Sequence, residues 1–234
     1  MKTSTKILIA VAAVGTGAAI AWIVTRKRSQ VGELVEQTES GGAIAKVYRS
    51  SMPIDERVGH IQDMVWKSVK DPQVRQLGLA ITGCGTRRVV VGSQAYTIDG
   101  ACCPARDGLC EADAIGRWTA ENIRYTGDIA PIKHGRNGPT EGIDVFQSAA
   151  RTAEYGGEDC DGHTIINSSL LAVNGIQSKM AVTAPSKFGS FGHIYTEAML
   201  PKNDPSKFVP LDTTLPGYET GREVPFGRKR RFDA

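Results

Sequence analysis

The sequence lacks a large excess of charge of either sign. Its 28 Lys and Arg residues stand against 25 Asp and Glu, so the formal net charge of the 234-residue chain is only +3. The basic residues cluster in two short runs, RKR at 26–28 and RKRR at 228–231. Because nucleic-acid binding needs an extended basic face, we expect no nucleic-acid partner and interpret both runs as flanks or tails.

Cysteine is also scarce, and its spacing fits no zinc knuckle. The five cysteines are an odd number without a Cys-x-x-Cys pair, unlike the even sets of small disulfide-stapled domains. We therefore expect at least one free thiol, which suits a reducing compartment or a catalytic cysteine. For the other four, buried thiols, one or two disulfides and a less favoured zinc site are open alternatives. These four are Cys84, Cys102, Cys103 and Cys110.

Long apolar runs are missing except for one near the N-terminus. Residues 7–24 (ILIAVAAVGTGAAIAWIV) carry no charge and would form a helix about 27 Å long, enough to cross a hydrocarbon core. The basic run at 26–28 stands where a signal peptide would carry its cleavage site, so residues 1–28 are predicted to be an uncleaved single-pass membrane anchor. A secreted enzyme with a cleaved leader is the alternative.

The orientation of this anchor is weakly encoded. Basic residues flank both ends, with a small excess on the C-terminal side, which slightly favours a cytoplasmic C-terminal domain. Residues 29–50 are polar and contain a Gly-Gly pair, so we predict a flexible tether. The folded domain is expected at 51–221 and a basic tail at 222–234.

Helical and strand-like patterns follow one another through residues 51–221, which predicts a single α+β domain. Apolar residues recur at helical spacing from Val58 to Val69, until an Asp-Pro pair stops the run and opens a second short helix. Residues 88–98 are rich in β-branched side chains and predict a strand or hairpin. Further helices are predicted around 109–118 and 145–154, with a Gly- and Pro-rich loop at 126–142 between them.

A buried helix is predicted to begin at Cys160. The residues after it form an apolar stripe at helical spacing, which ends at Asn174-Gly175, a typical C-terminal stop. Three strand-like runs follow, at 178–184, 192–200 and 207–211. This order predicts a helix that packs on an antiparallel sheet.

The start of a helix gives Cys160 the chemical setting of a nucleophile. A cysteine attacks acyl carbons as the thiolate, and the unpaired amides and dipole of a helix N-terminus lower a thiol pKa. The same amides can hold the oxyanion of a tetrahedral intermediate. His193, on the second strand-like run, would take the thiol proton, and Asp212, at the end of the third, would orient the imidazole.

Each of these residues also has a structural interpretation. A lone cysteine is more often part of a core, a strand histidine is more often simply hydrogen-bonded, and an aspartate before two threonines is a common turn former. Asp159, Asp161 and His163 suggest a metal site, but these helix positions do not share one face, so we expect no metal and no cofactor. The ordered combination of cysteine, histidine and aspartate is what favours catalysis.

Four sequence words resemble the transglutaminase-like superfamily of papain-like cysteine enzymes. They are GEDCDGH at 157–163, LLAVNGI at 170–176, HIYTE at 193–197 and VPLDTT at 209–214. Together with NIRYTGD at 122–128, they extend the resemblance over about residues 103–221. Bacteriophage and prophage members look most similar.

The resemblance implies a papain-like, transglutaminase-like core with a Cys-His-Asp triad, carried here by Cys160, His193 and Asp212. It does not choose a reaction, because the superfamily contains cross-linking acyltransferases, peptidases, glycopeptide amidases and inactive members. Two positions depart from the family's glycine-aspartate-cysteine-aspartate-aspartate signature. Glu158 replaces the glycine and Gly162 replaces an acidic residue, which bears on substrate preference more than on the triad.

The predicted function is therefore a cysteine enzyme that acts on amide or peptide bonds through a thioester acyl-enzyme. Water as acceptor gives a peptidase or amidase, and an amine gives a protein cross-linking acyltransferase. Protein or peptide substrates are implied, with cell-wall peptide or virion proteins as targets of a phage-encoded member in a host or virion membrane. The alternative is a catalytically silent membrane or virion structural protein that uses the fold as a binding module.

Four acidic residues surround the predicted nucleophile in the sequence: Glu154, Glu158, Asp159 and Asp161. If they form a rim around the site, they favour a cationic substrate group such as the amine of a lysine or a diamino acid. A solvated acidic face is the alternative. The sequence indicates no particular oligomeric state.

Overall fold

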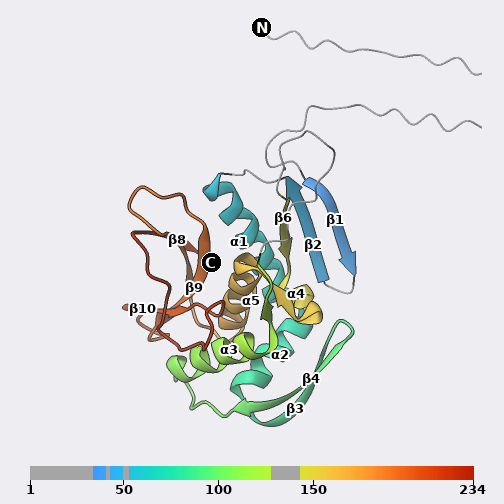
Figure 1. The fold of residues 1–234 in the computed structure, drawn as a ribbon. Helices are drawn as coiled ribbons and strands as arrows, with labels where there is room; N and C mark the ends of the chain where they lie inside the picture. The colour runs from blue at the N-terminus through green and yellow to red at the C-terminus, as the bar shows by residue number, and fades with distance from the viewer. Residues whose placement is uncertain (1–33, 41–42, 50–52, 128–142) are drawn as a thin grey trace, which may run out of the picture.

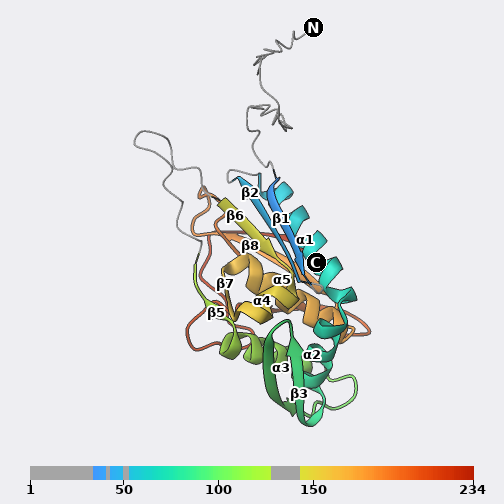
Figure 2. The same cartoon turned by 90° about the vertical axis from the view of Figure 1, so that its right-hand side faces the viewer.

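The computed structural model describes residues 34–40, 43–49, 53–127 and 143–234. Within these ranges the chain forms a mixed α/β fold of five helices and several small sheets. Helix α5 (Cys160–Val173) lies in the middle, with a four-stranded sheet on one side and a three-stranded sheet on the other (Figure 1, Figure 2). The elements packed around α5 therefore determine how the candidate site is built.

Helices α1 (Ile54–Lys70) and α2 (Pro72–Thr82) confirm the two helices predicted at the start of the domain. Asp71 separates them because its carboxylate accepts a hydrogen bond from the Gln73 N–H at 2.8 Å, which caps α2. Pro72 fits the first turn of α2, where no N–H donor is needed. The apolar faces of both helices are buried in the common core and pack against α5.

Strands β3 (Cys84–Val91) and β4 (Gln94–Ala101) form an antiparallel hairpin, which confirms the predicted strand-rich segment. Helix α3 (Gly108–Asn122) follows, close to the helix predicted around 109–118. Two disulfides fix the base of the hairpin and the start of α3. They join Cys84 to Cys102 and Cys103 to Cys110.

The disulfides settle the alternatives that the sequence left open for these four cysteines. Cys84 lies opposite Ala101 in the hairpin register, so strand pairing brings its thiol to the neighbouring Cys102. The first turn of α3 brings Cys110 to Cys103 in the same way. Zinc ligation and buried free thiols are therefore wrong for all four.

Strands β1 (Leu34–Ser40), β2 (Ala43–Arg49) and β6 (Ile143–Gln147) form an antiparallel sheet in the order β1-β2-β6. This sheet corrects two predictions: residues 34–40 and 43–49 are strands rather than a tether, and the helix predicted at 145–154 is a strand followed by the shorter α4 (Ala149–Tyr155). The pairing of β2 with β6 joins segments that are far apart in the sequence, so no local sequence pattern indicates it.

The second sheet is antiparallel throughout, in the order β10-β9-β8-β11. Strands β8 (Ser178–Ala184) and β10 (Lys207–Leu211) match the predicted strands residue for residue, and β9 (His193–Leu200) begins one residue later than predicted. The predicted basic tail at 222–234 is wrong, because β11 (Arg228–Asp233) pairs with β8. The fold therefore extends past residue 221.

A buried carboxylate explains why this basic segment forms a strand. Glu197 on β9 is only 1% exposed and forms ion pairs with Lys229 at 3.0 Å and Arg231 at 2.5 Å. Aromatic rings face the same cations, with Lys229 over Phe226 and Arg231 over Phe208. Much of the charge of β11 is therefore compensated within the fold.

The predicted membrane anchor at 7–24 lies outside the described residues, so the anchor and its orientation stay predictions. Most of the loop predicted at 126–142 lies outside them as well. Among the helices that the structure does describe, none has the length and apolar character needed to cross a membrane.

Candidate active site

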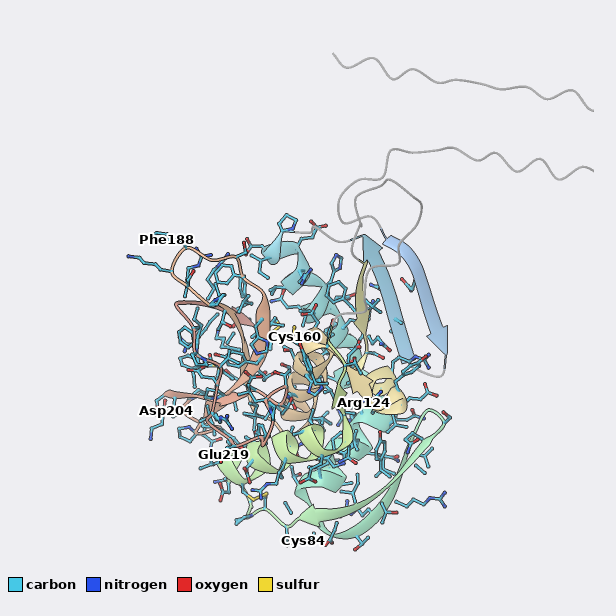
Figure 3. The ribbon with its side chains drawn as sticks, in the orientation of Figure 1. Cys84, Arg124, Cys160, Phe188, Asp204 and Glu219 are labelled. Atoms are coloured by element: carbon cyan, nitrogen blue, oxygen red, sulfur yellow. A yellow bond between two sulfur atoms is a disulfide. The ribbon has the colours of Figure 1, made fainter. Side chains whose placement is uncertain are left out.

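Cys160 is the first residue of α5, as the sequence predicts. The chain reaches it through a short connection: Gly156 ends α4 in the left-handed conformation at φ 67°, and β7 (Gly157–Glu158) pairs in parallel with β5 (Arg124–Tyr125). Figure 3 shows Cys160 near the centre of the molecule, at the N-terminal end of α5. It is half-buried and is the one cysteine of the five outside the two disulfides, which confirms the predicted free thiol.

Asp159 caps the helix that Cys160 opens. Its Oδ1 accepts hydrogen bonds from the backbone N–H groups of Asp161 at 2.9 Å and Gly162 at 3.2 Å. Two first-turn amides are thus bound to the cap, so the expectation that they hold an oxyanion is wrong for Asp161 and Gly162. What the cap contributes is a fixed geometry for the start of α5.

His193 and Asp212 are hydrogen-bonded, with His193 Nε2 and Asp212 Oδ2 2.9 Å apart. Asp212 is fully buried, and its other oxygen accepts a hydrogen bond from the Thr214 hydroxyl at 2.7 Å. Burial opposes ionisation of this carboxyl, but the hydrogen bonds from His193 and Thr214 prevail and hold the pKa of Asp212 below its ordinary value. A carboxylate at Nε2 favours the tautomer with its proton on that nitrogen, which leaves Nδ1 able to accept one.

Cys160 and His193 line the same small pocket, which has a volume of about 20 Å³. Its walls come from the first residues of α1, the start of α5, strand β8 and the segment that leads into β9. The structure thus brings two of the predicted site residues into one pocket and binds the third, Asp212, to the histidine. The other lining residues are Ile54, Arg57, Asp161, Val182, Phe191, Gly192 and Ile194.

The predicted acidic rim is present only in part: Asp159 and Asp161 each have a carboxylate oxygen within 4.8 Å of the Cys160 sulfur, whereas Glu154 and Glu158 are engaged elsewhere. Asp161 alone of the four acidic residues lines the pocket, and its Oδ1 lies 3.8 Å from the Cys160 sulfur. Glu154 is bound instead to Arg151 and to Ser93 of the hairpin connection. Arg57 lines the pocket as well, so the charge around Cys160 is mixed. The pocket therefore does not specifically favour a cationic substrate group.

Glu158, one of the two departures from the family signature, is buried directly before the helix cap. Its side chain packs over Gly162, and both the Gln147 side chain and the backbone N–H of Asp159 hydrogen-bond to its carboxyl. Burial and the nearby Asp159 and Asp161 raise the pKa of Glu158 to about 8. The carboxyl is therefore mostly neutral at pH 7.

From the sequence His163 is only a candidate metal ligand, and the structure places it in a buried network next to Asp212. Its Nδ1 lies 2.8 Å from the Thr213 hydroxyl, and Asn167 donates a hydrogen bond to the same hydroxyl at 2.9 Å. Burial lowers the pKa of His163 to about 4, although the charge of Asp212 opposes the shift. The signal available in the sequence was a histidine three residues after Cys160, on a helix predicted to be buried.

Asp159, Cys160 and Asp161 each place one potential metal-ligand atom within 4.8 Å of the others. His163, the third residue of the metal set considered from the sequence, is not part of this group. Since Asp159 Oδ1 already serves as the helix cap, we assign no metal to the cluster.

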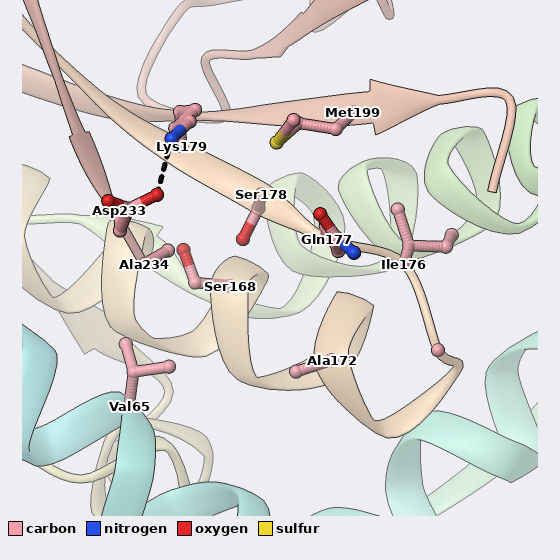
Figure 4. Close-up of a pocket in the computed structure, with 11 residues that line it drawn as sticks. Val65, Ser168, Ala172, Ile176, Gln177, Ser178, Lys179, Met199, Asp233 and Ala234 are labelled. Atoms are coloured by element: carbon pink, nitrogen blue, oxygen red, sulfur yellow. Dashed lines mark hydrogen bonds and ion pairs between the residues drawn. The ribbon is translucent and has the colours of Figure 1, made fainter. Parts of the chain in front are cut away.

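A larger cavity of about 450 Å³ lies along α5, away from the nucleophile (Figure 4). Val65, Ser168, Met199 and the ion pair between Lys179 and Asp233 are among its walls. It shares no lining residue with the pocket at Cys160 and contains neither cysteine nor histidine. Its size therefore does not make it the better candidate for thiol chemistry.

Comparisons with known proteins add little to this geometry. No protein-family model matches the chain, and no curated protein matches it. A similar solved structure is named "The Crystal Structure of a Putative Cysteine Protease from Cytophaga hutchinsonii", with 16% sequence identity and a TM-score of 0.38. The match covers 81% of this chain and 60% of that one, so this chain spans less than two thirds of its length. A similarity this low carries no argument about activity.

Proposed function

We propose that this chain is a papain-like cysteine enzyme of the transglutaminase-like type, with Cys160 as nucleophile, His193 as base and Asp212 as the residue that orients the base. The arrangement around His193 carries the proposal. Its ring is hydrogen-bonded to a buried carboxylate and lines the pocket of the one free thiol. Such a convergence of three chain segments is what thiol catalysis requires.

In this reaction the Cys160 thiol gives its proton to Nδ1 of His193, and the thiolate attacks the carbonyl carbon of an amide. Asp212 stabilises the resulting imidazolium through Nε2. The carbon–nitrogen bond then breaks while His193 returns the proton to the leaving amine, which leaves a thioester on Cys160. Water or a second amine attacks the thioester, His193 takes the acceptor's proton, and the thiol is restored.

The acceptor decides between a peptidase or amidase and a cross-linking acyltransferase. Protein or peptide amides are the proposed substrate class, and the resemblance to phage members adds cell-wall peptide and virion proteins as candidates. The small pocket and its mixed charge, with Arg57 and Asp161 on its walls, are the features that any substrate must match.

We also propose that the folded domain works in an oxidising compartment. Disulfides persist there and are rare where thiols are kept reduced, and this domain carries two. If residues 7–24 anchor the chain, the domain then lies on the non-cytoplasmic side of the membrane. This placement reverses the slight preference drawn from the flanking basic residues.

Labelling with an iodoacetamide probe tests the proposed nucleophile. The other four cysteines are in disulfides, so Cys160→Ala provides a background without a free thiol. We expect selective labelling of Cys160 near neutral pH, and a mass increase of one acyl group on Cys160 after treatment with an activated ester. If neither modification distinguishes the wild type from Cys160→Ala, the fold is a binding module rather than an enzyme.

A further inference from the structure

A buried acid stands two residues before the proposed nucleophile. Glu158 is only 7% exposed, and its Oε1 has no hydrogen-bond partner within the part of the chain that the structure describes. Gln147 from β6 and the backbone N–H of Asp159 hydrogen-bond to the same carboxyl. An ionised carboxylate would use both oxygens as acceptors, whereas a carboxylic acid keeps one oxygen for its proton.

The side chain of Glu158 also holds the first turn of α5 in place. A Cβ built on Gly162 would lie 1.6 Å from Glu158 Cγ, so the glutamate fills the space beside that turn. The backbone carbonyl of Glu158 accepts a hydrogen bond from Thr126 at 3.0 Å, which ties the same residue to the strand pair β5 and β7. Glu158 is therefore fixed at both its backbone and its side chain immediately before Cys160.

We propose that Glu158 is a positioning residue for Cys160. In its neutral form it holds the first turn of α5 in place, and its ionisation disfavours the Cys160 thiolate. The inference rests on the proposed function, because it assumes that Cys160 reacts as a thiolate. Glu158 does not line the pocket, so it acts through the turn and through its charge rather than by touching a substrate.

The position of Glu158 means that its ionisation would disfavour the thiolate form of Cys160. A negative charge there would join two carboxylates at the start of α5, and like charges next to a thiol disfavour the thiolate. Burial already raises the pKa of Glu158 to about 8, within reach of ordinary experiments. The titratable or polar groups of the neighbouring elements are Asp159, Asp161 and His163 on or beside α5, Gln147 on β6, and Arg124 and Tyr125 on β5.

The test is the pH profile of Cys160 alkylation between pH 6 and 10, compared between the wild type and Glu158→Gln. Glutamine keeps the shape and a hydrogen-bonding group but cannot ionise. We expect the wild-type rate to stop rising, or to fall, as Glu158 ionises, and the Glu158→Gln rate to continue rising for at least about one further pH unit. The shape of the profile is the readout, because a structural role alone changes only its height.

Glu111→Gln is the matched control, because it removes a carboxylate of the same size from α3, where Glu111 pairs with Lys202 at 2.7 Å. Its profile should follow that of the wild type. Superimposed profiles for the wild type and Glu158→Gln overturn the role of Glu158 while leaving Cys160 as nucleophile. Absence of selective labelling at every pH overturns the proposed nucleophile, and Glu158 then has nothing to position.

Gly162→Ala keeps the proposal testable if Glu158→Gln does not fold. The added methyl must displace the Glu158 side chain from its place beside the turn. We expect slower alkylation of Cys160 at neutral pH in Gly162→Ala and partial recovery in Glu158→Gly/Gly162→Ala, which removes the Cβ and the Cγ of residue 158 from the turn. Equal rates in the wild type and a folded Gly162→Ala overturn the positioning role.

Discussion

Glu158 and Gly162 share one space: a side chain at position 162 would begin 1.6 Å from Cγ of Glu158. These are the two positions that differ from the signature of the superfamily that the sequence resembles, and the contact couples them in the structure. A glutamate before the helix cap requires a residue without a side chain in the first turn of α5.

This contact predicts a change of sign in the effect of Gly162→Ala on stability. Beside Glu158 the methyl overpacks the turn, and we expect a loss of about 1–3 kcal/mol. In a Glu158→Gly background neither the Cβ nor the Cγ of residue 158 remains beside the turn, and replacement of the helical Gly162 by alanine should stabilise by about 0.5–1 kcal/mol. Urea unfolding of the four proteins in this double-mutant cycle measures both values. Additive effects would show that the two residues do not compete for space.

The second prediction concerns the orientation of the proposed base. Asp212→Asn keeps the size of the buried side chain but lets the amide donate a hydrogen bond to Nε2 of His193, which favours the wrong tautomer. We expect acylation of Cys160 by an activated ester to slow by about 10²–10⁴-fold. Asp233→Asn, which alters an exposed carboxylate paired with Lys179, is the control and should acylate at the wild-type rate. Similar rates for both variants would argue against a base oriented by Asp212.

Local signals predicted the elements that hold this site well. The apolar stripe after Cys160 and the stop at Asn174-Gly175 are encoded within a few residues, and α5 has the predicted start. Two of the four strands of the second sheet also match to the residue. The strand-like composition of these two runs is a local property as well.

Long-range partners were what the sequence could not supply. The basic segment at 228–231 becomes a strand because Glu197, more than thirty residues earlier, neutralises two of its cations. The hairpin of β1 and β2 gains its third strand from β6, with Ser148 accepting a hydrogen bond from Ile44 across 104 residues. The contact between Glu158 and Gly162 likewise depends on how the chain turns at the helix cap.

The third prediction is that the basic strand is structural. Replacement of both Lys229 and Arg231 by methionine leaves Glu197 as a buried carboxylate without its two cations. We expect a loss of about 3–5 kcal/mol in the free energy of unfolding, since an uncompensated buried charge remains. Arg228→Met, at an exposed position of the same strand, should cost far less. Equal, small effects would restore the interpretation of this segment as a tail.

The fourth prediction concerns thiol content. Five cysteines less the four in two disulfides leave one, so the native protein should react with one equivalent of a thiol reagent, and Cys160→Ala with none. Reduction followed by denaturation should expose five thiols in the wild type. A disulfide stabilises a fold by restricting the unfolded chain, so reduction should lower the free energy of unfolding by about 2–4 kcal/mol for each bond. More than one reactive thiol in the native, unreduced protein would contradict the pairing.

The last prediction is the pH dependence of stability, which two buried groups set with opposite signs. Glu158 binds its proton more tightly in the folded state, with a pKa of about 8 against an ordinary 4.5, so its contribution to stability falls as pH rises through that window. His163 binds its proton less tightly, with a pKa of about 4 against 6.5, so its contribution rises between those values. The two offset each other from about pH 4.5 to 6.5.

Above pH 6.5 Glu158 acts alone, and its contribution should fall by about 2 kcal/mol by pH 8. Glu158→Gln lacks this proton, so its stability relative to the wild type should increase by the same amount over the interval. Urea unfolding at pH 6.5 and pH 8 in the same buffer salts gives the comparison, and the difference between the proteins removes the effects of other titrating groups. A constant difference between the two proteins would mean that Glu158 ionises normally in the fold, and the neutral acid beside Cys160 would lose its support.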